Sequence, residues 1–229
     1  MNPAPAENVV YGLFDPADRA AKMRLASGSK PGVLADIYDA DISIAVWQRP
    51  PETLLTDAVV GFLAANPTLS AAVVVAPDTT HSALKDATRG TLPSQLSNDI
   101  AELVDMYCCL FNLERAGLRL ATIDRAMCPR FHVDRMPCRL LTTYHGSATE
   151  WLPHNKVNRS KLGARSGGKP DAVSGLYQSP ADIQQLDTGD VALIKGALWH
   201  DDETTGLVHR SPAVAPGERR LLLSLDFAD

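Results

Sequence analysis

The sequence predicts an α+β protein in which N-terminal helices cover a β-rich C-terminal part. Two observations predict this class. Before Gly117, apolar residues recur at steps of three and four over a long segment, as on the buried face of a helix. After Gly117, short runs rich in β-forming residues alternate with Gly, Pro, Asn and Asp, which is typical of strands joined by turns.

The N-terminal part is predicted to contain two strands and two helices. The apolar run Ile42–Trp47 predicts the first strand, and two prolines then open a helix at Glu52–Ala65. Ala71–Val75 predicts a second buried strand. The longest periodic pattern predicts a helix from Leu96 through Phe111, which we expect Gly117 to end.

The C-terminal part is predicted to be all-β. The expected strands are Leu118–Ile123, Arg130–Asp134, Arg139–His145, Val191–Ile194 and Arg220–Phe227. Between the third and fourth of them, Asn155–Ser174 is polar and rich in Gly, and we expect it to be a long mobile loop.

The predicted organisation is one composite domain behind a lead-in arm. Residues 1–36 are rich in Ala, Pro, Gly and Ser, which favours an extended arm. Residues 37–229 then form the domain, with residues 37–117 as mainly helical support and residues 118–229 as the β core. We expect one unit because the helices need a sheet to cover.

The composition excludes several classes of protein. The chain has 229 residues, of which 45% are hydrophobic and 21% are charged, so it is not a disordered chain. The formal net charge of −5 disfavours a protein that mainly binds nucleic acid. No apolar run reaches the roughly 20 residues of a membrane helix, and the N-terminus shows no secretion signal. We therefore expect a cytoplasmic protein that binds neither membrane nor nucleic acid.

A His-x-Asp pair is the first indication of a metal site. On a strand, side chains alternate between faces, so His132 and Asp134 point the same way while Phe131 and Val133 point into packing. A neutral imidazole and a carboxylate in this arrangement can take neighbouring positions on one metal ion. Such a pair occurs often by chance, so it predicts no site by itself.

The C-terminus strengthens this indication. His209 lies in the β-rich region, and an Arg follows about ten residues later in the last predicted strand. Two His and one carboxylate form the facial triad of non-haem Fe(II) oxygenases, which leaves three positions on the ion open. A 2-oxoacid can take two of them and dioxygen the third, while an Arg binds the distal carboxylate of the oxoacid.

In these residues the sequence resembles the Fe(II)/2-oxoglutarate-dependent dioxygenase superfamily, over residues 118–227. The resemblance implies a double-stranded β-helix (jelly-roll) core, Fe(II) and 2-oxoglutarate, and His132, Asp134 and His209 as the catalytic metal ligands. It also implies an oxygenase acting on a small molecule or a protein side chain. The whole chain is similar to a bacterial family labelled domain of unknown function 1826, which carries no reaction with it.

The resemblance implies further residues that bind the oxoacid. Arg220 and Ser224 share one face of the last strand, and we expect this face to line the lumen. Arg219 shares the opposite, apolar face, so we favour Arg220 over Arg219 as the clamp. The resemblance also implies a Tyr or Arg on the strand Arg139–His145, and Tyr144 is our choice.

Two alternatives stay open. The same scaffold serves cupin-like proteins that bind Zn, Ni or Mn without oxygenase activity, for example in metal homeostasis. A second His-x-Asp at His200 and Asp202 offers a different ligand set, although a polar loop is favoured there. Structural zinc at Cys128, His132 and Cys138 is disfavoured because the spacing is not that of known zinc sites.

Overall fold

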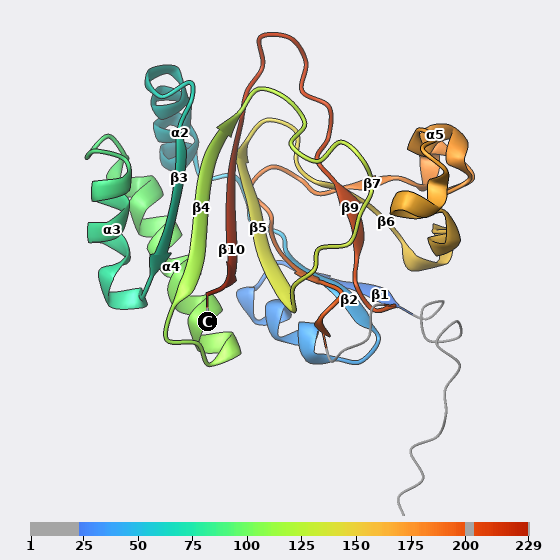
Figure 1. Cartoon of the computed structure of the whole chain (residues 1–229). Helices are drawn as coiled ribbons and strands as arrows, with labels where there is room; N and C mark the ends of the chain where they lie inside the picture. The colour runs from blue at the N-terminus through green and yellow to red at the C-terminus, as the bar shows by residue number, and fades with distance from the viewer. Residues whose placement is uncertain (1–22, 200–203, 229) are drawn as a thin grey trace, which may run out of the picture.

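Two β-sheets form the framework of the protein, for which a computed structural model describes residues 23–199 and 204–228. The strands are β1 (Arg24–Gly28), β2 (Ile42–Trp47), β3 (Ser70–Val75), β4 (Ala116–Ile123), β5 (Cys138–His145), β6 (Glu150–Leu152), β7 (Gln184–Gln185), β8 (Val191–Lys195), β9 (Val208–Arg210) and β10 (Arg220–Phe227). A seven-stranded sheet has the order β1-β2-β8-β5-β10-β4-β3, and a three-stranded sheet has the order β7-β6-β9. The result is a mixed α/β architecture with a large sheet and a few helices (Figure 1).

Three helices cover one face of the large sheet (Figure 1). They are α2 (Thr53–Ala65), α3 (Thr80–Ala87) and α4 (Ser94–Phe111). The predicted helices at 52–65 and 96–111 are confirmed, whereas α3 was not predicted. Helix α4 ends at Phe111 because Asn112 adopts a left-handed conformation with φ of 52°. Gly117 therefore does not end the helix, as we predicted, but lies inside β4.

The side chains of β10 alternate between two cores. Leu221, Leu223 and Leu225 are fully buried against the helices. Leu222 instead packs into a second core between the two sheets, which also contains Leu141 of β5. The predicted apolar face of β10 is confirmed, and its other face looks into the space between the sheets.

The predicted lead-in arm is wrong for the residues that the structure describes. Residues 24–28 form β1, which pairs in parallel with β2 at the edge of the large sheet. Residues 31–38 form a 3-10 helix whose Leu34 and Ile37 are buried. These apolar side chains pack in the core, which the Ala, Gly and Pro content of the segment did not predict. Residues 1–22 lie outside the described part.

Two further predictions need correction. Arg130–Asp134 is not a regular strand, because only His132 forms a ladder bridge, with His209. Asn155–Ser174 is not a featureless loop but contains short 3-10 turns and helix α5 (Asp171–Ser174), which lie beyond the small sheet (Figure 1). A third core, containing Phe131, packs between this segment and the small sheet. No helix in the described ranges is long and apolar enough to cross a bilayer.

His154, at the start of this segment, predicts a loss of stability in acid. Burial and the nearby Arg159 lower the pKa of His154 to about 4, against 6.5 for a free His. Between these values the unfolded chain binds more protons than the folded one, so the free energy of unfolding falls as the pH falls from 6.5 to 4. We expect a loss of roughly 3 kcal/mol from this group. Urea denaturation across this pH range measures it.

The matched variant is His154→Gln, because an amide can still accept from Arg159 and donate to Ser43, as the ring nitrogens are placed to do. The variant is expected to lose part of the pH slope. An identical slope in both proteins would contradict the assignment to His154.

Candidate metal centre

His132 and His209 lie opposite each other in a single antiparallel bridge. The amide of His132 donates to the carbonyl of His209 at 3.0 Å, and the reverse bond measures 2.9 Å. This pairing places the two imidazoles side by side, with ring centroids 4.6 Å apart. Two chain segments separated by more than seventy residues thus present equivalent side chains to one point between the sheets.

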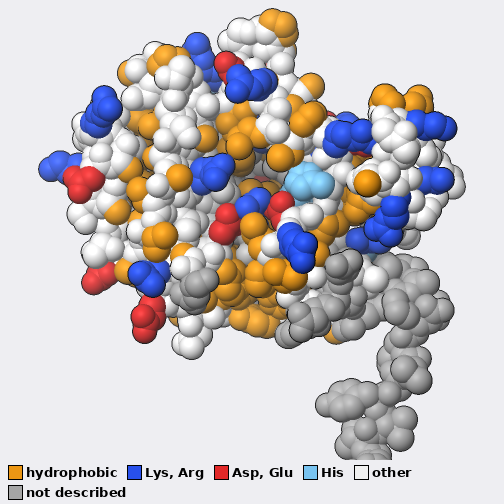
Figure 2. Space-filling view, viewed as in Figure 1, with side chains coloured by type: hydrophobic (Ala, Val, Ile, Leu, Met, Phe, Trp, Pro, Cys, Tyr) orange, Lys and Arg blue, Asp and Glu red, His pale blue; other side chains and the backbone are white. Residues whose placement is uncertain are grey.

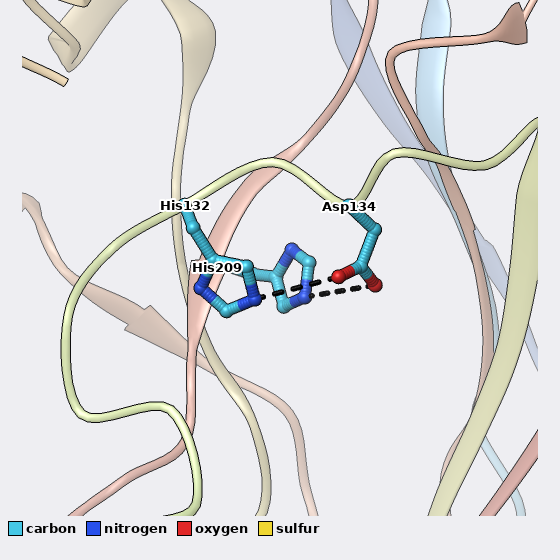
Figure 3. A group of neighbouring side chains, drawn as sticks. All are labelled: His132, Asp134 and His209. Carbon is cyan, nitrogen blue, oxygen red and sulfur yellow. Dashed lines mark ion pairs between the residues drawn. The ribbon is translucent and has the colours of Figure 1, made fainter. Parts of the chain in front are cut away.

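Asp134 completes the group (Figure 3). Its Oδ1 lies 3.4 Å from Nε2 of His132, and its Oδ2 lies 3.4 Å from Nε2 of His209. One donor atom from each residue lies within 4.8 Å of the other two. Neighbouring donors at about 2.1 Å from one ion lie about 3.0 Å apart, so small movements bring all three onto a single ion. No group containing a cysteine meets the same criterion among the described residues.

The outer nitrogens of both imidazoles face backbone carbonyls. Nδ1 of His132 lies 2.9 Å from the carbonyl oxygen of Arg130, and Nδ1 of His209 lies 3.1 Å from that of Leu207. A carbonyl only accepts, so each Nδ1 carries a proton, and each Nε2 gives up the proton that it donates to Asp134 when it binds an ion, which leaves the neutral Nδ1–H form of the ring. This is the tautomer that a metal ion requires, so the donor set fits a divalent transition metal.

The charge state of Asp134 suits the same role. Burial alone would raise the pKa of Asp134, but hydrogen bonds from His132 and His209 and the charge of Arg139 hold it far below its ordinary value. Burial would likewise lower the pKa of His132, yet the contact with Asp134 raises it overall. The carboxylate is therefore ionised at neutral pH and available as an anionic ligand.

Arg139 of β5 binds the carboxylate of Asp134. Its Nη1 donates to Oδ2 of Asp134 at 2.6 Å. Its Nε and Nη2 donate to the two oxygens of Asp226 on β10 at 2.6 and 2.8 Å. The bidentate pair fixes the guanidinium in one plane, so Arg139 orients Asp134 and leaves its Oδ1 toward the centre.

Asp226→Asn is expected to weaken metal binding about 10- to 100-fold, the range for partners that orient metal ligands. Without the charge of Asp226, Arg139 is free to pair with both oxygens of Asp134 and so competes with the ion. Metal affinity by competition with a chelator dye measures the effect. Asp124→Asn, at an exposed position, is the control for the change in net charge. Equal affinities in the two variants would contradict this role.

A cavity of about 200 Å³ opens beside the centre. Figure 2 shows the hollow beside a His side chain, with charged side chains of both signs in it. It is lined by Arg119, Ala121, Met127, Cys128, His132, Arg139, Leu141, Thr149, His209, Arg210, Ser211, Leu222 and Ser224. The centre therefore lies in the wall of a space that admits a small molecule.

Arg220, the first residue of β10, is buried and has few hydrogen-bond partners among the described residues. Arg220 is 1% exposed, and its Nε and Nη1 have no hydrogen-bond partner among the residues that the structure describes. Its Nη2 has only a long contact, 3.5 Å, to the hydroxyl of Thr143. Burial lowers the pKa of Arg220 to about 10, which still leaves it charged at neutral pH. A buried cation with two unpaired nitrogens is poised to receive an anion.

Gly146 gives the Arg220 side chain its room. Its φ is 81°, a conformation that favours glycine, and a Cβ there would lie 2.6 Å from the carbonyl oxygen of Arg219 and 2.9 Å from Cγ of Arg220. The Gly that follows β5 therefore lets the start of β10 approach closely.

The structure brings together the three predicted ligands but corrects the oxoacid residues. Tyr144 lies on the helix-covered face, where its hydroxyl donates to Asp99 at 2.6 Å, so it does not line the cavity. Arg219 is exposed and outside the cavity. Ser224 lines the cavity as expected, but Thr143 is the hydroxyl beside Arg220.

Sequence reasoning missed the partners of the site, namely Arg139, Thr143 and Asp226. Arg139 and Thr143 share a face of β5 with Leu141, and the alternation of this strand was readable. We chose the other face because it carries Tyr144. Which face of β5 lines the cavity follows from the pairing of Leu222 with Thr143 and of Ser224 with Leu141. The residue pattern of β5 does not predict this pairing. The second His-x-Asp, at His200 and Asp202, lies outside the described residues.

Comparison with known proteins identifies a family and a set of similar folds. The sequence profile of the family described as "Protein of unknown function (DUF1826)" matches residues 28–226, which confirms that resemblance. No curated protein matches the chain. A rice dioxygenase for auxin oxidation shares 12% identity over 89% of this chain and 82% of that chain, with a TM-score of 0.47.

Two bacterial structures are similar to the same degree. A putative oxygenase from Shewanella oneidensis shares 10% identity over 89% of each chain, with a TM-score of 0.49. A prolyl-4-hydroxylase from Pseudomonas putida shares 12% identity over 86% of this chain and 96% of that chain, with a TM-score of 0.42. At these identities and TM-scores, the similarities carry no argument about the activity of this chain.

Proposed function

We propose that this chain, which belongs to the DUF1826 family of proteins of unknown function, is a non-haem Fe(II), 2-oxoglutarate-dependent oxygenase. The observation that carries the proposal is the pairing of two features in one protein. A His-Asp-His group converges between the sheets, and a buried Arg220, two of whose nitrogens have no partner among the described residues, shares its strand face with Leu222 and Ser224, which line the cavity beside that group. One feature suits a metal ion, and the other suits a carboxylate.

The strand pairing supports a double-stranded β-helix around this space. In the large sheet, β8, β5, β10 and β4 are consecutive, and in the small sheet β7, β6 and β9 are consecutive. The bridge between His132 and His209 adds a fourth segment to the small sheet, beside β9. Two facing layers of four segments, joined in this order, are what a jelly roll requires. Strands β1, β2 and β3 then extend the large sheet beyond the core.

The ligand set favours iron among the metals that fit. Two imidazoles and one carboxylate on one side of an ion leave open positions on the other side, as in Fe(II) oxygenases. Fe(II) with 2-oxoglutarate would supply the oxidation of an unactivated C–H group. His132, Asp134 and His209 would hold the metal, and Arg139 would keep the carboxylate of Asp134 oriented toward it.

Arg220 would anchor the far carboxylate of the oxoacid. Two of its nitrogens are free to donate, and the hydroxyl of Thr143 is near enough to contribute a third donor. Charge-assisted bonds of this kind are strong in a buried setting. The anchor would orient the oxoacid so that its other end reaches the metal.

Anaerobic titration of the purified protein tests the proposal. Fe(II) and 2-oxoglutarate together are expected to produce a weak metal-to-ligand charge-transfer band in the green region of the visible spectrum. Fe(II) alone is expected to produce no such band. Pyruvate is the matched control, because it keeps the chelating end but lacks the carboxylate that Arg220 would bind. At the same concentration it is expected to give a weaker band.

If Fe(II) and 2-oxoglutarate together give no charge-transfer band, the oxygenase proposal is contradicted. Tight binding of Zn, Ni or Mn without any binding of 2-oxoglutarate would instead favour a cupin-like metal-binding protein. The charged Arg220 argues against that alternative, because a protein with no anion to bind gains nothing from a buried, unpaired guanidinium.

A further inference from the structure

Arg119 and Ser224 form a second pair of hydrogen-bond donors at the cavity. They lie directly opposite each other on β4 and β10, and both line the cavity with His132 and His209. Side chains at opposite positions of an antiparallel pair have Cβ atoms about 4.5–5.5 Å apart. One small group can therefore contact both the guanidinium and the hydroxyl.

Neither side chain has a partner within the described part of the chain. Ser224 is 7% exposed, yet its hydroxyl makes no hydrogen bond there. Arg119 is exposed and makes no ion pair there. Both side chains are therefore free to donate to a group that enters the cavity.

The other charges beside the cavity are already matched. Arg139 pairs with Asp134 and Asp226, and Arg210 donates to Glu150 at 2.6 Å. Under the proposed function, Arg220 is matched by the oxoacid. Among the cavity-lining residues, Arg119 is then the cation that remains unmatched, and it is exposed.

We propose that Arg119 and Ser224 bind an anionic group, a carboxylate or a phosphate, of the oxygenase's prime substrate. This inference rests on the proposed function and names the substrate class for the same site. Ala121, Leu222 and Met127 also line the cavity and suit a short apolar portion of the substrate. The cavity of about 200 Å³, part of which the oxoacid would fill, restricts the inserted part to a small organic anion.

Binding of defined probes tests the proposal. The protein is loaded with Zn(II) and saturating 2-oxoglutarate, so that Arg220 is occupied and no turnover takes place. Hexanoate and hexyl phosphate are titrated against their neutral counterparts, hexanamide and hexan-1-ol, with saturation-transfer NMR as the readout. At least one anion is expected to bind about tenfold or more tightly than its neutral counterpart, and the preferred anion identifies the group.

Substitutions at Arg119 and Ser224 test whether these two residues cause the preference for the anionic probes. Arg119→Gln is expected to abolish the difference between anion and neutral probe, and Ser224→Ala is expected to weaken the anion about threefold to tenfold. Arg115→Gln removes an exposed Arg just before β4 and is expected to change nothing. Equal binding of anions and neutral probes, no binding of either anion, or an unaffected Arg119→Gln would each overturn the inference.

The same samples separate this inference from the proposed function. If Zn(II) and 2-oxoglutarate bind but the anion preference does not depend on Arg119, only the inference fails. If 2-oxoglutarate does not bind while hexanoate or hexyl phosphate still requires Arg119, the proposed function fails and the anion site stands.

Discussion

Asp134→Ala is expected to lower the affinity for Fe(II) by more than about 100-fold while the fold is retained. Partners that merely orient a ligand change metal affinity about 10- to 100-fold, and loss of the ligand itself removes more. Asp134 is held in the apo protein by His132, His209 and Arg139, and Arg139 keeps its second partner Asp226 in the variant. The guanidinium is therefore not left buried without a carboxylate, and the variant is expected to fold, although it loses the stabilisation that the lowered pKa of Asp134 represents.

Metal content after dialysis against Fe(II), together with thermal unfolding, measures the two effects separately. His132→Ala is expected to behave in the same way, because its ring is another donor. Asp124→Asn serves again as the exposed control. Retained iron in both Asp134→Ala and His132→Ala would refute the ligand assignment.

Arg220→Met is expected to abolish binding of 2-oxoglutarate and, at the same time, to stabilise the protein without ligand. Removing one partner of a buried, hydrogen-bonded charge pair costs about 2–5 kcal/mol of binding. The ligand-free protein gains because the lowered pKa of Arg220 corresponds to roughly 3 kcal/mol against its charged form. Replacing buried ionic groups with apolar side chains of similar volume is often neutral or stabilises by about 1–4 kcal/mol, and we expect a gain here because Arg220 has no anionic partner in the described residues.

The unfolding temperature without ligand is expected to rise by about 2–4 °C per kcal/mol gained. Calorimetry with 2-oxoglutarate on the Zn(II) protein measures the lost binding, and metal content is expected to be unchanged. Arg219→Met, at the exposed neighbour, is expected to alter neither quantity. A destabilised Arg220→Met that still binds 2-oxoglutarate would show that Arg220 is a structural residue.

The sequence predicted most of the long elements because their patterns are local. Helix α4 and strands β2, β3, β5 and β10 carry apolar periodicities that need no partner to be recognised. The short strands β6, β7 and β9 were missed, since two or three residues hold no period. They exist because a neighbouring strand supplies their hydrogen bonds, and β9 is fixed by its pairing with β6 and with His132.

The residues of the site show the same contrast between features that are local in the sequence and features that depend on strand pairing. The convergence of His132, Asp134 and His209 was predictable, because ligand chemistry restricts the residue types that can form such a group. The residues that support them were not, because Arg139 meets Asp226 across the register of β5 and β10. The choice of Tyr144 failed for the same reason, since the sequence alternation of β5 is equally compatible with either face lining the cavity.

An anomalous-difference map at the iron edge, from crystals grown anaerobically with Fe(II), locates the ion relative to its ligands. One peak is expected, with Nε2 of His132, Nε2 of His209 and a carboxylate oxygen of Asp134 each about 2.0–2.3 Å away. A peak that lacks any of these three donors, or no peak between the two sheets, would contradict the ligand assignment.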